Sequence, residues 1–331
     1  MSAERLAEVS DLFVVAAVLL YLFAMIGFAL ELAFGRVRTD KAVARAKRPV
    51  TVGAADGGEV IETTRPVTVG AADGGEVIEA AGPVAEVAAT PRWVIRSGQV
   101  GLGIAWAGWA ANLAAIVTRG LAAGRWPWGN MYEFVVAICF AALSAFLFTQ
   151  LRHNIRFLGA FVTVTAALGL GFAVRTFYTV AGPVVPALNS YWIAIHVTAA
   201  ILATGMFVLA GVSGILYLCR GDGPSRLPSK ADLEKVAHRA IVLAFPLWTF
   251  AVIAGALWAD RAWGRYWGWD PKEVWSFITW VGYAAYLHAR VTAGWRGRAA
   301  TIVQLVAFAC LLFNLFGVNI FISGLHSYAD V

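Results

Sequence analysis

A tryptophan-rich stretch is the first part of this sequence whose residues suggest a specific chemistry. Six of the fourteen tryptophans lie in WADRAWGRYWGWDPKEVWSFITW, residues 258–280: Trp258, Trp263, Trp267, Trp269, Trp275 and Trp280. Tryptophan favours the boundary between lipid and water, so an aromatic belt is the simplest interpretation. A belt needs only one or two indoles at each helix end, however. Indoles crowded into one loop therefore also allow a second interpretation, a flat apolar platform that suits a large planar aromatic ligand.

The residues that close this stretch predict a firmly started helix. Asp270 is a good N-cap, Pro271 suits the first helical position, and Glu273 completes a capping box. We therefore expect an ordered loop, in which Asp270 shapes the turn.

Two histidines can act together with this loop. His196 lies near the start of one apolar run and His326 lies just beyond the last one. The distribution of positive charge assigns both to the side of the membrane on which the loop lies. A planar ligand over the loop would have one imidazole on each side of a central metal, and neutral imidazole is a good axial ligand for haem iron. Each histidine alone is more simply a hydrogen-bonded interfacial residue, but the common face favours ligand binding.

The other three histidines lie elsewhere. His288 follows Trp275 by about 13 residues on one predicted helix, roughly 20 Å deeper at 1.5 Å per residue. It could hold a second, inner ligand only with a partner. His153 and His238 lie in basic inner loops, where solvated histidines are the simpler interpretation.

The composition predicts that membrane-spanning helices position these residues. Sixty per cent of the chain is apolar, 14% is charged, and the mean hydropathy is +0.70. These values lie outside the range of soluble domains. Eight apolar runs are long enough to span or nearly span a bilayer. They lie near 11–34, 98–118, 131–149, 157–174, 191–219, 240–259, 274–290 and 300–322. We therefore predict an all-α polytopic bundle of about eight transmembrane helices.

Positive charge orients this bundle. Most of the 26 Lys and Arg residues lie in every second loop, including the flanks of residues 35–92, and positively charged loops mark the inner side. This places both termini and the loop 260–273 outside. The basic residues form no block, so the net charge of +6 does not indicate nucleic acid binding.

The domain organisation has three parts. Residues 1–34 form the first transmembrane helix, residues 35–92 a flexible cytoplasmic linker, and residues 93–331 a membrane core with the Trp-rich loop at 258–280. The linker contains a direct repeat, RPVTVGAADGGEVIE, at 48–62 and 65–79. Two copies are too few for a solenoid, so local duplication is the simpler origin.

Cysteine placement excludes several other kinds of site. Cys139, Cys219 and Cys310 each lie inside an apolar run, none forms CxxC, and none has a histidine at metal-ligand spacing. A disulfide framework, a zinc site and a redox pair are therefore unsupported.

The Trp-rich stretch and the segments around it resemble those of a known family. WGRYWGWDPKEVWSFITW looks like the signature of the WWD-domain haem-handling proteins, and it is most similar to the CcsA/ResC proteins of System II cytochrome c maturation. The flanking segments agree in order and spacing: FPLWTFAVIAGALWA, YLHAR, GWRGR and GVNIFISGLHSY, with NMYEF earlier in the chain. The resemblance covers residues 185–328 well and extends more thinly back to about 125. The first span, the linker and the repeat lie outside it.

The resemblance implies specific ligands. His196 and His326 match the two outer histidines that ligate haem b, and His288 matches a histidine of an inner haem site whose second ligand comes from a ResB-type membrane partner. The outer haem would lie over Trp263, Trp267, Trp269 and Trp275, beside Asp270. Arg261, Arg265 or Lys272 could pair with its propionates. Relatives commonly have Tyr-Arg where this chain has His238-Arg239, so no ligand role is carried onto His238.

The resemblance also implies a function. Such proteins bring haem to the outer face and present it, bis-His ligated, for thioether attachment to the CxxCH motifs of apocytochrome c. Holocytochrome c synthase activity is expected only in complex with the ResB-type partner. Further expected partners are thiol-reducing proteins that act on the apocytochrome, and membrane lipids. The Ala-, Gly- and Arg-rich composition favours a bacterial plasma membrane over a plastid thylakoid.

Two alternatives stay open. A bis-His electron-transfer subunit of a respiratory complex would usually have histidine pairs at two depths, whereas this chain has one inner histidine. A small-solute transporter would be expected to have broken helices or an inverted repeat, and the sequence shows neither.

Overall fold

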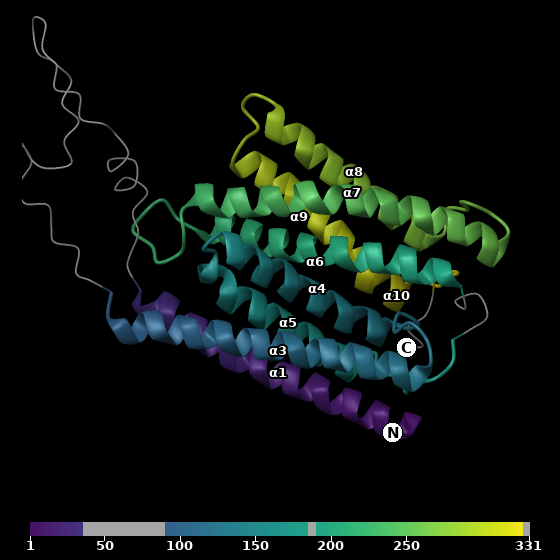
Figure 1. The fold of residues 1–331 in the computed structure, drawn as a ribbon. Coiled ribbons are helices and arrows are strands. Elements are labelled where there is room, and N and C mark those ends of the chain that lie inside the picture. Colours follow the sequence, from purple (N-terminus) through teal and green to yellow (C-terminus); the bar gives the residue numbers. More distant parts are fainter. Residues whose placement is uncertain (36–89, 185–189, 327–331) are drawn as a thin grey trace, which may run out of the picture.

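The computed structural model describes residues 1–35, 90–184 and 190–326, and its regular elements are helices (Figure 1). The predicted 35–92 linker and its repeat lie almost wholly outside these ranges. The long helices are α1 (Ala3–Phe34), α3 (Arg92–Ala123), α4 (Met131–Arg152), α5 (Gly159–Thr176), α6 (Tyr191–Cys219), α7 (Lys230–Trp263), α8 (Pro271–Val291) and α9 (Arg298–Leu312). A 3-10 turn, Arg156–Leu158, precedes α5, and α9 continues through a π-helical turn, Phe313–Gly317, into α10 (Val318–Phe321).

Each predicted apolar run corresponds to a helix, which confirms the all-α polytopic fold. Within the described residues, seven helices are long and apolar enough to cross a membrane. The eighth, α8, has 21 residues but is more polar, since it carries Lys272, Glu273, His288 and Arg290.

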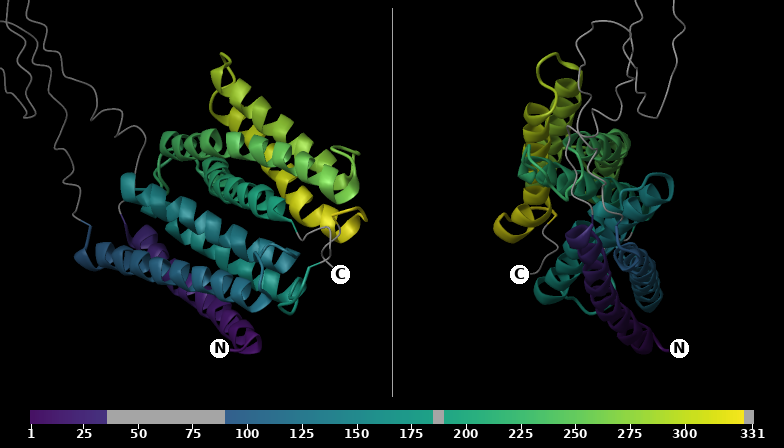
Figure 2. Two further views of the ribbon diagram at one scale, coloured as in Figure 1. Left: turned by 45° about the vertical axis from the view of Figure 1, so that its right-hand side comes forward. Right: turned by 90° about the vertical axis from the view of Figure 1, so that its left-hand side faces the viewer.

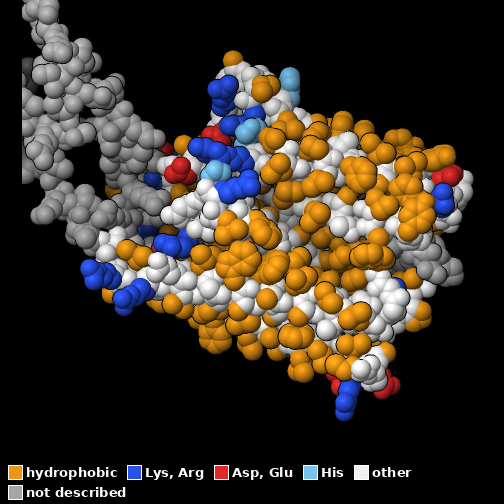
Figure 3. Space-filling model, in the orientation of Figure 1, with side chains coloured by type: hydrophobic (Ala, Val, Ile, Leu, Met, Phe, Trp, Pro, Cys, Tyr) orange, Lys and Arg blue, Asp and Glu red, His pale blue; other side chains and the backbone are white. Residues whose placement is uncertain are grey.

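The helices run back and forth in neighbouring pairs, α1 with α3, α6 with α7 and α8 with α9, while α4 and α5 fill the middle (Figures 1 and 2). The α3–α4 and α7–α8 loops therefore lie at one end of the bundle, called here the tryptophan end (Figure 1). His326 lies there too, since it lines one cavity with Trp128 and Trp267 from these loops. The α6–α7 and α8–α9 loops lie at the opposite end. Lys and Arg side chains gather there (Figure 3), as the charge pattern predicts.

Small residues allow the helices to approach closely. A Cβ on Gly27 of α1 would lie 2.9 Å from the Cα of Gly101 on α3, and a Cβ on Gly205 of α6 would lie 2.6 Å from Ala141 on α4. Close backbone contacts of this kind replace the hydrophobic effect as the source of packing energy between helices in lipid.

Candidate functional site

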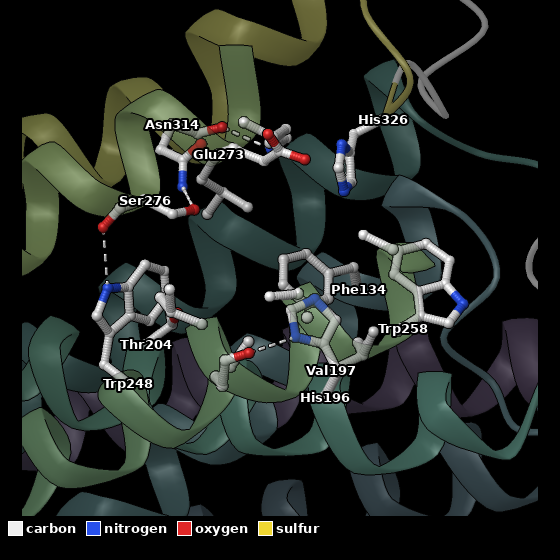
Figure 4. A pocket seen from close by; sticks show the side chains of 18 of the residues that line it. Phe134, His196, Val197, Thr204, Trp248, Trp258, Glu273, Ser276, Asn314 and His326 are labelled. Atoms are coloured by element: carbon white, nitrogen blue, oxygen red, sulfur yellow. Dashed lines mark hydrogen bonds between the residues drawn. The ribbon is translucent and has the colours of Figure 1, made fainter. Parts of the chain in front are cut away.

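A cavity opens at the tryptophan end between α4, α6, α7, α8 and the end of α9 (Figure 4). It encloses about 1170 Å³ including its open mouth. Its lining is mostly apolar and aromatic, and its few polar groups include His196, Lys272, Ser276, Asn314, Asn319 and His326. The site therefore suits a mainly apolar ligand that can meet a few polar groups.

His196 enters the cavity from the first turns of α6. Its Nδ1 donates to the backbone oxygen of Ala251 on α7, 2.8 Å away. The ring fits against α7 only because residue 255 is glycine, since a Cβ there would lie 2.7 Å from His196 Cε1. The lack of a side chain on Gly255 and the carbonyl of Ala251 thus fix the orientation of this imidazole.

His326 faces the same cavity from the segment after α10 (Figure 4). Its Nδ1 lies 2.9 Å from Asp270 Oδ2, and the Trp263 ring packs 4.9 Å from the imidazole centroid. In both histidines Nδ1 therefore donates to an oxygen. With the proton on Nδ1, Nε2 of each imidazole keeps its lone pair and can accept or bind a ligand.

Asp270 ties His326 to the start of α8. Its Oδ1 accepts the backbone N–H of Leu325 at 2.8 Å, and its Oδ2 accepts that of Lys272 at 3.3 Å. Burial alone would raise the pKa of Asp270, but the bonds from His326, Leu325 and Lys272 outweigh it and hold the pKa below its usual range. The carboxylate thus stays charged. Only the imidazole ring of His326 separates it from any ligand bound at that histidine.

The four predicted platform tryptophans take different places. Trp267 lines the cavity, while Trp263 packs between Trp258 and His326. Trp269 is 66% exposed, and Trp275 packs against Phe313 at 4.3 Å. The Trp267 and Trp269 rings stand at 89° to each other. Of the four, Trp267 is the one that lines the cavity, and their rings do not form a single flat surface.

Glu273 explains the shape of the loop, which covers only residues 264–270 between α7 and α8. The predicted capping box is confirmed. Glu273 Oε2 accepts the N–H groups of both Gly268 and Asp270, at 2.8 and 3.0 Å. Trp269 lies between these two residues and is held at φ 59°, a conformation that bulky side chains rarely adopt. The loop is therefore ordered, as predicted.

A second loop repeats this arrangement. Both α3 and α7 end at a left-handed glycine followed by an arginine, Gly124-Arg125 and Gly264-Arg265. Eight residues after each arginine is a glutamate that binds it, Glu133 to Arg125 and Glu273 to Arg265. The α3–α4 loop brings Trp128, and the start of α4 brings Phe134, into the cavity wall.

Sequence analysis did not assign this second loop to the site. The recurring spacing in GRWPWGNMYE, residues 124–133, and GRYWGWDPKE, residues 264–273, was the available signal. Trp258 was also left out of the assigned site, although its ring centroid lies 6.0 Å from those of both His196 and His326.

His288 does not line the cavity. Its side chain is exposed near the end of α8 that lies away from the tryptophan end, and no group of three His, Cys, Asp or Glu residues suited to a metal occurs in the described ranges. His238 lies half-buried, with Nδ1 3.5 Å from the Tyr286 hydroxyl, and His153 follows the last residue of α4.

The contact between Gly255 and His196 gives a first prediction. Gly255→Ala is expected to destabilise the protein by about 1–3 kcal/mol, because the added methyl group overpacks a ring that Ala251 holds in place. Gly103→Ala is the matched control, since a Cβ at this helical position meets nothing within 4 Å. Thermal unfolding in detergent measures both. Equal unfolding midpoints for the two variants would show that His196 is not held as described.

Similar proteins point to one process. Residues 128–326 match the family model described as Cytochrome C assembly protein. The Cytochrome c biogenesis protein CcsA of Guillardia theta is 32% identical over 238 residues, covering 64% of this chain and 79% of the relative. That of Gloeobacter violaceus is 32% identical over 287 residues, covering 66% and 85%. The CcsA of Chlamydomonas reinhardtii is 34% identical, with 64% of each chain covered.

One solved structure is similar in fold. It is described as Cytochrome c Heme Lyase CcmF and aligns with a TM-score of 0.57 at 16% identity. The alignment covers 96% of this chain but only 47% of the other, so this chain spans about half of that protein.

Proposed function

Because the chain belongs to the cytochrome c assembly protein family, we propose that it handles haem during the maturation of c-type cytochromes. The resemblance to CcsA-type proteins that the motifs indicate is confirmed at the level of the family.

The observation that carries the proposal is the histidine pair. His196 and His326 come from segments far apart in the sequence, yet both face one apolar cavity, and both use Nδ1 to donate to a fixed oxygen. A planar apolar ligand with a central iron and two open axial positions fits this donor set. We therefore assign haem b to the cavity as substrate, with His196 and His326 as its axial ligands and Trp258, Trp263 and Trp267 around it.

The chain's own groups position the haem and protect its iron. His196 and His326 would hold the iron from both sides, which would leave no open position for oxygen and so would slow the oxidation of ferrous iron. The cysteine thiols of an apocytochrome CxxCH motif then add across the haem vinyl groups, so that each S–H contributes its sulfur and its hydrogen to one double bond. Cys139, Cys219 and Cys310 do not line the cavity, so the thiols come from the substrate. The histidine of that motif would displace one axial ligand at release.

The proposal includes an inner site and a partner. His288 lies apart from the cavity, and we assign it to an inner haem whose second ligand comes from a ResB-type membrane protein. Synthase activity belongs to that complex, acting on apocytochromes kept reduced by thiol-reducing proteins. The location we propose is a bacterial plasma membrane, with the tryptophan end outside.

Removal of the protein tests the function. Deletion of its gene should abolish covalently attached haem on c-type cytochromes, and the full chain supplied in trans should restore it; haem-stained gels measure both. Unchanged c-type cytochromes would contradict the proposal. The electron-transfer alternative predicts instead that the purified haem-bound chain is reduced and reoxidised by quinone, which the assembly function does not require.

A further inference from the structure

The cavity has a polar end that the axial histidines do not use. Figure 4 shows Asn314, Ser276 and Trp248 on the side of the cavity away from Trp258, with His196 between the two sides. Lys272, on the first turn of α8, lines the cavity together with Asn314 and Ser276. These groups and both histidines line one cavity, so a ligand held between the histidines shares that cavity with them.

Among the described residues, Lys272 is the Lys or Arg side chain that lines this cavity, and none of their acids binds its Nζ. Its Nζ makes one hydrogen bond within the described residues, to the backbone oxygen of Asn314 at 2.5 Å, although an ammonium group has three N–H donors. The neighbouring acids are occupied. Asp270 binds Leu325 and His326, and Glu273 binds Gly268, Asp270 and Arg265. Burial lowers the pKa of Lys272 to about 7, and Asp270 only partly opposes this, so an added anion would stabilise the ammonium form.

The π-helical turn after α9 makes this arrangement possible. In that turn the N–H of Val318 bonds to the carbonyl of Phe313, five residues back. The carbonyl of Asn314, which Val318 would take in an α-helix, is left for Lys272. The turn therefore holds the lysine at the cavity wall instead of letting it extend toward water.

The side chain of Asn314 supplies a second group. It is 6% exposed, its Nδ2 bonds to Ser276 Oγ at 3.0 Å, and its buried Oδ1 has no hydrogen-bond partner in the described part of the chain. A half-turn of the amide keeps the bond to Ser276, because a hydroxyl can donate as well as accept, and places an N–H where the unpaired Oδ1 lies. Lys272 and Asn314 can thus offer two donors to one acceptor group.

We propose that Lys272 and Asn314 form a carboxylate-binding subsite, which takes a propionate of the ligand held between His196 and His326. This inference rests on the proposed function for the identity of the ligand. It also selects Lys272 from the three basic residues, Arg261, Arg265 and Lys272, that the sequence offers as partners for a propionate. Arg261 lies over the Tyr191 ring and Arg265 pairs with Glu273, and neither lines the cavity.

Paired ligands test the subsite. The purified full chain is titrated with haemin and with haemin dimethyl ester, which lacks both carboxylates, and Soret absorbance gives each Kd. The native chain should bind haemin about tenfold more tightly than the ester, because a charge-assisted hydrogen bond is lost with the ester. Lys272→Met should bind the two equally, and Lys272→Arg should keep part of the preference. Lys235→Met, an exposed lysine of α7 at the opposite end, is the matched control and should keep all of it.

The outcomes separate this inference from the proposed function. A preference for haemin that persists in Lys272→Met would overturn the subsite while leaving haem binding intact. The iron-free pair, protoporphyrin IX and its dimethyl ester, measured by fluorescence, tests carboxylate recognition without axial ligation. If this pair is discriminated through Lys272 but iron adds no affinity, the subsite stands and the axial assignment fails. If no porphyrin binds, both fail.

Discussion

His196→Ala and His326→Ala are each expected to convert the six-coordinate, low-spin haem spectrum of the purified protein to a five-coordinate one, and the double variant is expected to lose this haem. The reason is geometric. Each imidazole is held by one acceptor, Ala251 O or Asp270 Oδ2, and no other described histidine lines the cavity to replace it. The yield of c-type cytochrome with covalently attached haem should fall as the low-spin haem signal is lost.

Two further variants make this test specific. His153→Ala, at the end of α4 away from the cavity, should leave both spectrum and yield unchanged. His326→Gly should regain a low-spin spectrum when imidazole is added, because the small residue leaves space where the ring was. A spectrum that stays low-spin in both single alanine variants would remove His196 and His326 as ligands. A spectrum that imidazole cannot restore would indicate a folding defect.

Local sequence patterns predicted those parts of the site that depend on short stretches of chain. The capping box of Asp270 and Glu273 follows from residue types three positions apart, and it is present. The helices follow from apolar run length. The positions of His196 and His326 relative to the ends of their runs placed both at the end where the Trp-rich loop lies, which is where the structure brings them together.

Other features depend on contacts that no local pattern encodes. The separation of Trp263, Trp267, Trp269 and Trp275 into different environments follows from ring packing against His326 and Phe313. The exposure of Lys272 to the cavity depends on a π-helical turn that lies 42 residues further along the chain. Hydrophobicity and spacing are the same for an α-helical and a π-helical turn, so the sequence did not reveal it.

In the two similar loops, a short sequence pattern places a glutamate that also makes contacts within the folded structure. Glu133 and Glu273 each bind a backbone N–H of the preceding loop and an arginine eight residues back. The first loop adds a further buried ion pair, from Arg119 to Glu133 at 3.1 Å. The two loops at the cavity mouth therefore share one arrangement, in which a buried glutamate binds an arginine and a backbone N–H. Each loop places aromatic side chains in the cavity wall. The aromatic lining depends on these buried glutamates as much as on the tryptophans themselves.

Asp270→Asn is expected to weaken haemin binding by about 10- to 100-fold, the usual effect of losing an outer-shell partner of a metal ligand. The carboxylate accepts Leu325 N–H on Oδ1 and His326 Nδ1–H on Oδ2, whereas an amide has only one oxygen. If the amide N–H faces His326, the imidazole must accept at Nδ1, and its proton moves to Nε2, the nitrogen that should bind iron. If the amide is turned over, Leu325 loses its acceptor.

The helix cap can be separated from this effect. Asparagine caps a helix about as well as aspartate, so Asp270→Asn should keep α8 intact, while Asp270→Ala loses both the cap and the histidine contact. Ser229→Ala removes the matching cap of α7, at the opposite end of the bundle, and should cost about 1 kcal/mol of stability with no change in haemin affinity. Haemin titration and thermal unfolding of the three variants give the two quantities independently. If Asp270→Asn binds haemin as the native chain does, the carboxylate serves the loop alone and His326 does not depend on it for its tautomer.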